Sequence, residues 1–554
     1  MAKWRSIPAV WTAVPLFLLF FWLALSGLAL DSPTMDEQNH LARGIAFVRT
    51  GDPRLSLEHP PLINSLSALP LLTLPNVTLP LDDPSWTELS PPDVYWYVFA
   101  DQFMWHVDND VTQMIFLGRL PIIFMLLGLG LVGYHFAREL WGRPSALLAL
   151  LLLLFEPNLL AHGRLITTDF GGTTFLFLAA YLLWRMWQVE GWSWPHWLAV
   201  GAAMGLAFSS KLSMLGFVPV FLLLAVLPLY PGGWRGAGRR LGQIISGGGA
   251  AVFVVWALFG FEWRPFRFPS AQMQFLNGIS GPMPTFWAGI DQIFNVSRGG
   301  RAAFLLGEFS DQGFPLYFPI AFLVKTPLAI LIALPIAALI LLWYKPTRRN
   351  ALFLLIPAFY YFSLSMWSGI NIGYRHLLPM LPFLLVLIGG VASLKVVSGG
   401  RLVLFGVVVL LLVETLTVRP HYLSFFNWVV GGPQAGANLL ADSNIDWGQD
   451  LRRLQDWMAE NDVEVVKLGW FGTADPAYYG LNYEPLPGFP RAEFLSLWAE
   501  PPFDPADPEP GIYAISASSL WESHWGQKTI YPWFRQREPD ARVGYSILIY
   551  EVEG

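Results

Sequence analysis

The segment Asp31-Ser-Pro-Thr-Met-Asp36-Glu37-Gln-Asn-His40 follows directly after an apolar run from Ile7 to Leu30. That run is long enough to cross a membrane, so the segment lies just outside a membrane span. Adjacent carboxylates in this position suit a general base or a metal ligand. Asp36 and Glu37 equally suit the first turn of a surface helix, which acidic residues stabilise.

The composition is that of an integral membrane protein. The chain has 554 residues, of which 54% are hydrophobic and 13% charged, whereas soluble proteins carry about 25% charged residues. The net charge of −6 and the lack of a long basic run give no reason to expect nucleic acid as a partner. Because the chain has no cysteine, disulfides, thiolate metal sites and a cysteine nucleophile are excluded.

Apolar runs predict eleven membrane spans. They lie near residues 7–30, 112–134, 145–161, 170–187, 196–209, 212–230, 243–261, 316–343, 350–367, 377–394 and 402–418. The start, Met1 to Arg5, together with the first run indicates a retained signal anchor.

Positive charges predict the orientation of these spans. With the N-terminus in the cytoplasm, the short outer turns hold only Arg164, Lys211 and Arg375. The short inner segments then hold most of the basic residues: Lys3, Arg5, Arg138, Arg143, Arg185, Arg235, Arg239, Arg240, Lys345, Arg348, Arg349, Lys395 and Arg401. An odd number of spans places the C-terminus outside, and we expect a multi-pass protein of the plasma membrane.

The predicted fold class is a polytopic α-helical membrane protein with about 11 transmembrane helices in residues 1–418. A small extracytoplasmic α/β domain would follow in residues 419–554, with a helix at 450–460 and strands at 463–470, 511–515 and 545–552. Two long outer loops, 31–111 and 262–315, face the same side. Within the first, Leu62 to Pro80 predicts an interfacial or re-entrant helix.

Further polar groups fall at the outer ends of spans. Asp169 begins the fourth span, where a carboxylate is costly unless it is hydrated, paired or bound to a cation. It is therefore a candidate second carboxylate, and its alternative role is to cap the helix. The basic candidates are Lys211, Lys325 and the pair Arg375-His376, which could bind a lipid-linked phosphate or extend toward headgroups.

Several motifs resemble the GT-C glycosyltransferases, in particular the branch of protein O-mannosyltransferases and aminoarabinose transferases. The resemblance is best over residues 10–215 and rests on Asp36-Glu37, Glu58-His59-Pro60-Pro61-Leu62, the position of Asp169, and Gly205 to Lys211. Later motifs resemble a bacterial group of membrane glycosyltransferases: Leu306-Gly307-Glu308, Tyr317-Phe318-Pro319, Lys325-Thr326-Pro327, Asn371 to Pro379, Phe426-Asn427, Gly431-Gly432-Pro433 and Asp442 to Asp450.

The resemblance implies an enzyme that moves a sugar from a polyprenyl-phosphate donor to a hydroxyl on the extracytoplasmic face, with inversion. Asp36 would be the general base. Glu37 and Asp169 would orient the acceptor or hold a divalent cation such as Mg or Mn, with Asp36 and Asp169 as its ligand pair. The donor phosphate would be bound by Arg375, His376, Lys211 and Lys325, supported by His59, Glu58, Tyr374 and Asn371.

The acceptor that the resemblance implies is a lipid, a glycan or a protein. The late trefoil domain of the eukaryotic mannosyltransferases is missing, which counts against a protein. The segment Asp442 to Asp450 predicts a tight loop before a helix, capped by Asp446 or Asn444. Asp446 and Trp447 would either contact the acceptor or dock the outer domain.

Two other classes of function stay open. A transporter or flippase for lipid-linked sugars would also be polytopic, but it would place charges at mid-membrane and show inverted repeats. A binding or assembly protein would not require the clustered carboxylates and cations. Both alternatives are less favoured than the enzyme.

Overall fold

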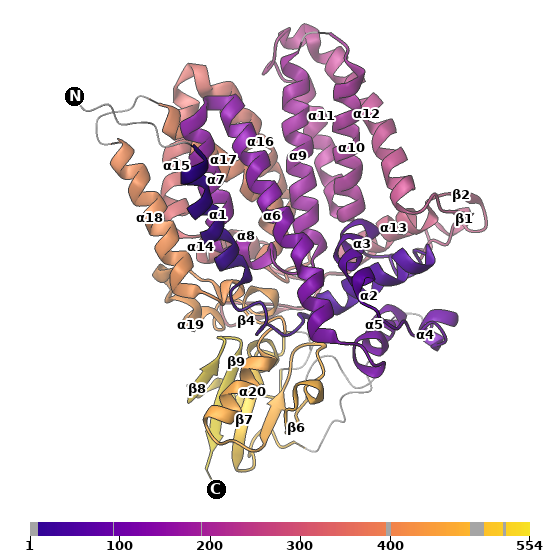
Figure 1. Ribbon diagram of the computed structural model, residues 1–554, viewed down its shortest axis with the longest axis vertical. Helices are drawn as coiled ribbons and strands as arrows, with labels where there is room; N and C mark the ends of the chain where they lie inside the picture. Colours follow the sequence, from indigo (N-terminus) through magenta and orange to yellow (C-terminus); the bar gives the residue numbers. More distant parts are fainter. Residues whose placement is uncertain are drawn as a thin grey trace.

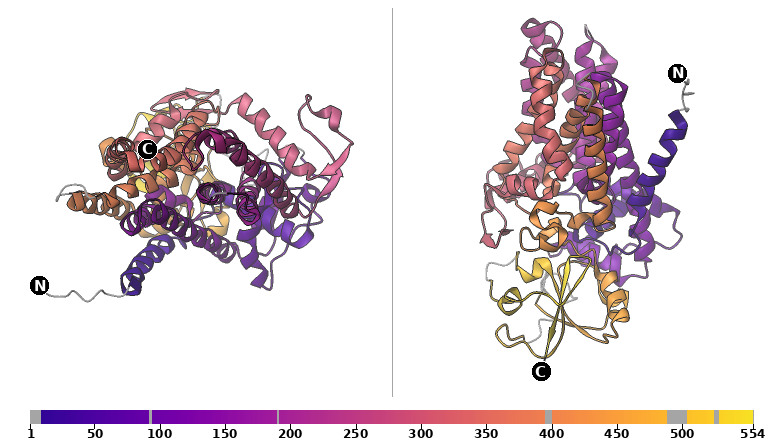
Figure 2. Two further views of the ribbon diagram at one scale, coloured as in Figure 1. Left: turned by 90° about the horizontal axis from the view of Figure 1, so that it is seen from above. Right: turned by 90° about the vertical axis from the view of Figure 1, so that its left-hand side faces the viewer.

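The computed structural model describes residues 9–91, 94–189, 191–394, 400–487, 503–523 and 528–553. Met1 to Arg5 and Lys395, used above for the anchor and the orientation, lie outside the described residues. Figure 1 shows a body of long helices with a β-sheet attached at one end, and the C-terminus lies at the far tip of that sheet. The side view in Figure 2 shows the same two parts stacked end to end.

Each of the eleven predicted apolar segments contains helix, as expected from its composition. The helices are α1 (Ala9–Leu25), α6 (Val111–Trp141), α7 (Arg143–Phe155), α8 (Pro157–His162), α9 (Thr168–Gln188), α10 (Trp194–Ser210), α11 (Val218–Val226), α12 (Ala237–Leu258), α14 (Tyr317–Lys325), α15 (Leu328–Trp343), α16 (Lys345–Met366), α17 (Leu381–Gly389) and α18 (Gly400–Val418). In the described part of the chain, three helical segments are long and apolar enough to cross a membrane alone: Val111–Trp141, Gly233–Leu258 and Tyr374–Ser393. Counting a bent pair as one span gives a fourth, so the number eleven stays a prediction.

The span predicted near 316–343 is divided into two helices. Helices α14 and α15 meet at 110° across Thr326-Pro327. Proline disfavours helical geometry at the residue before it and supplies no N–H. The carboxylate of Glu414 on α18 accepts from the backbone N–H of Leu328 at 2.9 Å, which satisfies the start of α15. The segment 145–161 is likewise divided, at Glu156-Pro157, where Glu156 accepts from the N–H of Leu159 at 2.6 Å.

The first outer loop folds into short helices beside the helical body: α2 (Met35–Thr50), α3 (Pro61–Ala68), α4 (Pro84–Thr87) and α5 (Tyr95–Asp101). Helix α3 and the 3₁₀ turn Leu69–Thr73 confirm helix in the first part of the predicted 62–80 segment. Helices α2 and α3 cross closely at Gly44, where an added Cβ would lie 2.0 Å from the carbonyl oxygen of Asn64. Only glycine permits this approach, which presses α2 against its neighbours.

The second loop contains α13 (Pro284–Gly299) and two short hairpins, formed by β1 (Trp263–Pro265) with β2 (Ser280–Pro282) and by β3 (Ala303–Leu305) with β4 (Glu308–Ser310).

The C-terminal region contains a five-stranded mixed sheet. Its strand order is β6 (Tyr483–Pro485), β5 (Val466–Gly469), β7 (Gly511–Ser516), β9 (Ile547–Val552) and β8 (Ala541–Val543). Strand β5 is parallel to β6 and β7, and β9 is antiparallel to β7 and β8. Helix α20 (Leu451–Glu460) packs on it, which confirms the predicted helix and the three predicted strands.

The segment between α18 and the sheet belongs to the helical body. Its buried side chains, from Tyr422 to Trp447, share the hydrophobic core of the helices. The separate core under the sheet begins at Leu451. This connecting segment includes α19 (Gly432–Gly436), while the short helices α21 (Ala517–Leu520) and α22 (Pro532–Arg535) follow β7.

Candidate active site

Asp36 and Glu37, adjacent in sequence, occupy different environments on the first turn of α2. Glu37 is fully buried and forms two hydrogen bonds with Arg119 of α6, at 2.8 and 2.6 Å. Its carboxylate also accepts from the backbone N–H groups of Thr34 and Ile166, each at 2.9 Å. The helix-capping interpretation is therefore confirmed for Glu37, whose oxygens have no free position for a substrate or a metal.

Arg119 is the partner that the sequence analysis missed. It is fully buried in α6 and also donates to the backbone carbonyls of Leu28, Asp31 and Ser32. A charged residue within an apolar run was the available signal, because such residues usually have a specific partner.

Asp36 is paired with Arg375, whereas Glu37 is paired with Arg119. Arg375 Nη1 donates to Asp36 Oδ2 at 2.6 Å, and the Asp36 side chain is 21% exposed. The guanidinium carbon of Arg375 also lies 4.1 Å from the ring centroid of Trp447. Burial alone would raise the pKa of Asp36, but the charge and hydrogen-bond interactions with its neighbours, led by the guanidinium of Arg375, together hold that pKa below its usual value. Asp36 is therefore ionised at neutral pH.

A second acid–base pair joins α9 to the turn after α10. Lys211 Nζ donates to Asp169 Oδ1, and both side chains are largely buried. The interpretation of Asp169 as a helix cap is wrong, because the N-cap position of α9 is Thr167. Asp169 also lies within electrostatic range of Asp36, Arg375 and His376. The structure thus brings together two of the three predicted catalytic carboxylates, Asp36 and Asp169, and three of the four residues predicted to bind the phosphate: Arg375, His376 and Lys211.

Two histidines border the same cluster. The rings of His40 and His59 lie edge to face with centroids 4.8 Å apart. His59 Nδ1 lies 3.3 Å from the hydroxyl of Thr168, next to Asp169. Burial lowers the pKa of His40 to about 4 and that of His59 well below its ordinary value. Both rings are therefore uncharged at neutral pH.

Lys325, the fourth predicted cation, is 1% exposed and holds the backbone in place. Its ammonium donates to the carbonyls of Leu423 and Asn444 and lies 4.5 Å from the ring of Phe426. We therefore correct its expected role from phosphate binding to support of the loop beneath the site.

Tyr374 and Asn371 also support that region. The hydroxyl of Tyr374 is 2.9 Å from the hydroxyl of Thr326, and its backbone N–H donates to Asn444 Oδ1 at 2.9 Å. Asn371 Oδ1 accepts from the N–H of Phe314 at 2.5 Å. These contacts fix the turn that carries Arg375.

The segment Asp442 to Asp450 connects the sheet to the site. Asp446 is fully buried and accepts from the N–H of Ser518 at 2.8 Å, so its contacts are those of a docking residue. Burial raises the pKa of Asp446 to about 8. The expected cap at Asp446 or Asn444 is wrong, since Asp450 occupies the N-cap position of α20. Trp447 supplies both the ring beneath Arg375 and a carbonyl that accepts from the N–H of Met35 at 2.9 Å.

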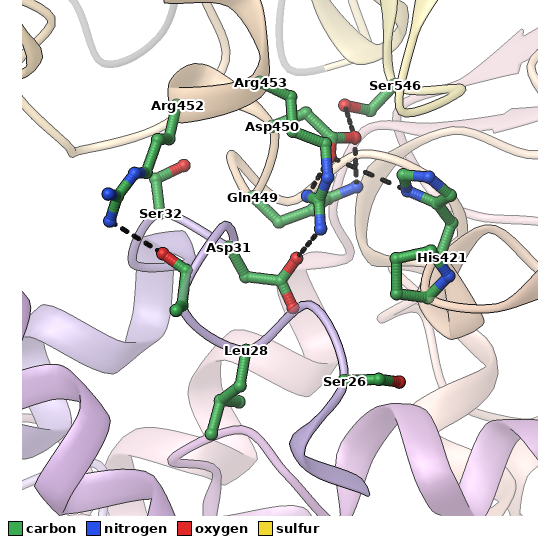
Figure 3. A network of polar contacts seen from close by, with 12 residues as sticks. Ser26, Leu28, Asp31, Ser32, His421, Gln449, Asp450, Arg452, Arg453 and Ser546 are labelled. Carbon is green, nitrogen blue, oxygen red and sulfur yellow. Dashed lines mark hydrogen bonds and ion pairs between the residues drawn. The ribbon is translucent and has the colours of Figure 1, made fainter. Parts of the chain in front are cut away.

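A buried ionic network, seen in Figure 3, fastens the C-terminal region to the first outer loop. Asp31 accepts from Arg453 at 2.5 Å and from Arg164 at 2.7 Å. Asp450 in turn accepts from Arg453 at 2.5 Å and from the hydroxyl of Ser546 at 2.6 Å. Asp31 lies five positions before Asp36, so this network holds the segment that leads into α2. Its members are distant in sequence, and the sequence analysis did not find it.

The expected divalent cation stays a prediction, and the two carboxylates named for it are already paired with basic side chains. Within the described ranges, no group of three or more histidine, aspartate or glutamate residues could hold a metal ion. Asp36 and Asp169 each face a basic side chain, which a cation would have to displace. Acid–base and electrostatic chemistry is what these side chains can supply.

One segment of the chain matches a known protein family. Residues 107–259, from α6 to the end of α12, match the family model described as dolichyl-phosphate-mannose-protein mannosyltransferase. The matched residues include Asp169 and Lys211 but neither Asp36 nor Arg375. A search of curated proteins gave no match.

Solved structures with similar arrangements were also found. ArnT from Cupriavidus metallidurans bound to undecaprenyl phosphate has 14% identity and a TM-score of 0.49, with 98% of each chain covered. The oligosaccharyltransferase AglB from Archaeoglobus fulgidus has 12% identity and a TM-score of 0.45, covering 71% of this chain and 51% of AglB. At such low values these likenesses carry no argument. The resemblance to the protein mannosyltransferases rests on the family model, which matches residues 107–259.

Proposed function

We propose that the chain is an integral membrane glycosyltransferase that uses a polyprenyl-phosphate sugar as donor and a hydroxyl group as acceptor. The reaction would take place on the extracytoplasmic face of the plasma membrane, and the N-terminus would be cytoplasmic. The observation that carries the proposal is the pair Asp36–Arg375, stacked on Trp447 and next to the pair Asp169–Lys211. The site therefore offers both a carboxylate base and fixed cations.

Asp36 acts as the general base. It takes the proton of the acceptor hydroxyl while the hydroxyl oxygen forms a bond to the anomeric carbon of the donor sugar. The bond from that carbon to the phosphate oxygen breaks, and its electron pair leaves with the phosphate. Attack from the side opposite the phosphate inverts the anomeric configuration.

Arg375, Lys211 and His376 hold the departing phosphate. The phosphate gains negative charge as the bond to the sugar breaks, so fixed positive groups lower the barrier. The guanidinium of Arg375 suits this role because its planar fork matches phosphate oxygens. His376 can contribute as a hydrogen-bond donor.

Donor binding would also prepare the base. Arg375 lowers the pKa of Asp36, which makes the carboxylate a weaker base. When the donor phosphate attracts the guanidinium, Asp36 loses part of this interaction and becomes more basic. Deprotonation of the acceptor is thereby coupled to the presence of the donor.

The test is sugar transfer by the purified protein in nanodiscs. Radiolabelled polyprenyl-phosphate mannose, glucose and arabinose are offered separately to the wild type and to Asp36→Asn. Transfer or donor hydrolysis by the wild type, lost in Asp36→Asn while Tm is unchanged, is the expected result. Movement of the lipid-linked sugar across liposomes without any turnover would instead identify a transporter and refute the proposal.

A further inference from the structure

Arg43 is a buried cation whose hydrogen-bonding groups are mostly unused. It lies on α2, 3% exposed, and its Nε and Nη1 atoms have no hydrogen-bond partner. Its nearest carboxylate oxygen, on Glu58, is 4.0 Å from Nη2, which is too far for a hydrogen bond. A buried guanidinium with unpaired N–H donors costs free energy unless another group accepts hydrogen bonds from them.

Arg43 shares a face of α2 with the proposed base. Asp36, His40 and Arg43 follow the spacing i, i+4 and i+7, which places them in one row along a helix. Helical side chains lean toward the N-terminus, so Arg43 leans toward Asp36. His40 lies between them and carries a buried Nδ1 without a partner.

The indole of Trp96 adds a second unused donor beside Arg43. The guanidinium carbon of Arg43 is 5.9 Å from the Trp96 ring centroid. Trp96 is 8% exposed, and its Nε1 is also buried without a partner. Its neighbour Tyr97 lies within electrostatic range of Asp36, Glu58 and Arg43, and burial and these carboxylates raise the pKa of the Tyr97 hydroxyl to about 12. Arg43, Trp96 and Tyr97 thus lie beside the site that contains Asp36.

The chemistry of this group favours a neutral hydroxylated ligand. Arginine and tryptophan only donate hydrogen bonds, whereas an ionised glutamate only accepts them. A hydroxyl can accept from Arg43 and donate to Glu58, and so bridge two groups that are too far apart to bond directly. A second phosphate would be repelled by Glu58. The uncharged His40 and His59 rings add no positive charge that would favour an anion.

We propose that Arg43 and Trp96, together with Glu58 and His40, form the subsite that binds the ring hydroxyls of the transferred sugar. This assignment rests on the proposed function. Arg375 would hold the phosphate, and Arg43 would hold the sugar attached to it. The indole of Trp96 also offers an apolar face, which suits a pyranose or furanose ring.

The test compares binding of lipids with and without the sugar. Undecaprenyl phosphate and its mannose, glucose and arabinose esters are titrated onto protein in nanodiscs. We expect the wild type to bind at least one ester more tightly than undecaprenyl phosphate alone. Arg43→Gln and Trp96→Phe should each weaken that ester about tenfold and leave the sugar-free lipid unchanged. Trp96→Phe keeps an aromatic face and removes the N–H donor, so it disturbs the packing less than Trp96→Ala would.

A matched pair of variants gives the control. Arg54 lies 4.5 Å from the ring centroid of Trp86 in the same loop, but its groups are satisfied by the carbonyl of Trp86 and by Asp52. Arg54→Gln and Trp86→Phe should leave the preference for the sugar ester intact. Arg375→Gln should weaken both kinds of lipid.

The remaining outcomes refute either the sugar subsite or the proposed function. If Arg43→Gln weakens both lipids equally or weakens neither, the sugar subsite is refuted. The subsite is also refuted if the wild type binds no ester more tightly than undecaprenyl phosphate. If the wild type binds none of these lipids, the proposed function itself fails.

Discussion

Arg375 lies with its guanidinium carbon 4.1 Å from the ring centroid of Trp447, a residue 72 positions later in the chain. The same guanidinium donates to Asp36 at 2.6 Å. The indole therefore fixes the plane of the cation that faces the proposed base. Because Trp447 belongs to the segment that docks the sheet, that segment contributes to the site as well as to the assembly of the two regions.

The stacking predicts a graded effect of substitutions at Trp447. Trp447→Phe keeps an aromatic face and should reduce kcat/KM only a few fold. Trp447→Ala removes a cation–π contact of about 2 kcal/mol in a desolvated site, which corresponds to roughly a 30-fold loss. We expect this loss mainly as weaker binding of undecaprenyl phosphate. Equal donor binding by Trp447→Ala and the wild type would contradict the role.

Substitutions at the two adjacent carboxylates of α2 should have different effects: a change at Glu37 should lower stability, and a change at Asp36 should abolish activity. Glu37→Gln or Arg119→Met leaves a buried charge without its partner, which costs about 3 to 5 kcal/mol. We expect a clear fall in the apparent Tm in detergent for either variant. Asp36→Asn should keep the wild-type Tm and lose activity, since its side chain is partly exposed.

The double variant Glu37→Gln with Arg119→Met checks the pairing. Removal of both charges leaves neither unpaired, so the double variant should be less destabilised than the sum of the single variants. Additive losses would mean that the two side chains act independently.

Much of the local structure was predictable from the sequence, because it depends on neighbours in the chain. The apolar runs predicted the helices, and the run of aliphatic and aromatic residues over 545–552 predicted strand β9. The breaks at Glu156-Pro157 and Thr326-Pro327 were readable in retrospect, since proline interrupts a helix. The sequence pointed to Asp36, Asp169 and Arg375 because a charged side chain at the end of a span costs free energy unless it is hydrated, paired or bound to a ligand.

The partners of these residues were not predictable, because they come from distant segments. Glu37 and Arg119 are 82 positions apart, and Asp31 and Arg453 are 422 apart. A periodic pattern shows which face of a helix is apolar, but it does not identify the element that packs on that face. For the same reason Lys325 was expected to bind phosphate, whereas its ammonium bonds to the carbonyls of Leu423 and Asn444.

The pairing of each carboxylate with a basic side chain predicts that activity does not depend on a metal. Arg375 and Lys211 already neutralise Asp36 and Asp169. Treatment with EDTA should therefore leave sugar transfer within about twofold of the untreated rate, a change of under about 0.5 kcal/mol in barrier. Loss of activity in EDTA, restored by Mg or Mn, would contradict this prediction and revive the original expectation of a metal site.

The raised pKa of Asp446 predicts that the free energy of unfolding depends on pH. Burial raises its pKa from an ordinary value near 3.8 to about 8 in the folded protein. Between these values the unfolded chain has released a proton that the folded protein keeps, so rising pH favours unfolding. The stability that Asp446 contributes is thus complete below about pH 3.8 and is lost as the pH rises through about 8.

Asp446→Asn removes the ionisable group and keeps an oxygen that can accept from the N–H of Ser518. Its apparent Tm should therefore fall less steeply than that of the wild type when the pH is raised from about 5.5 to about 9. The exposed Asp462 provides the control, because Asp462→Asn should keep the wild-type slope. If the profiles of Asp446→Asn and the wild type are parallel, Asp446 is ionised in the folded protein. The buried carboxylate must then be stabilised by more than its contacts with Ser518 and Gly448.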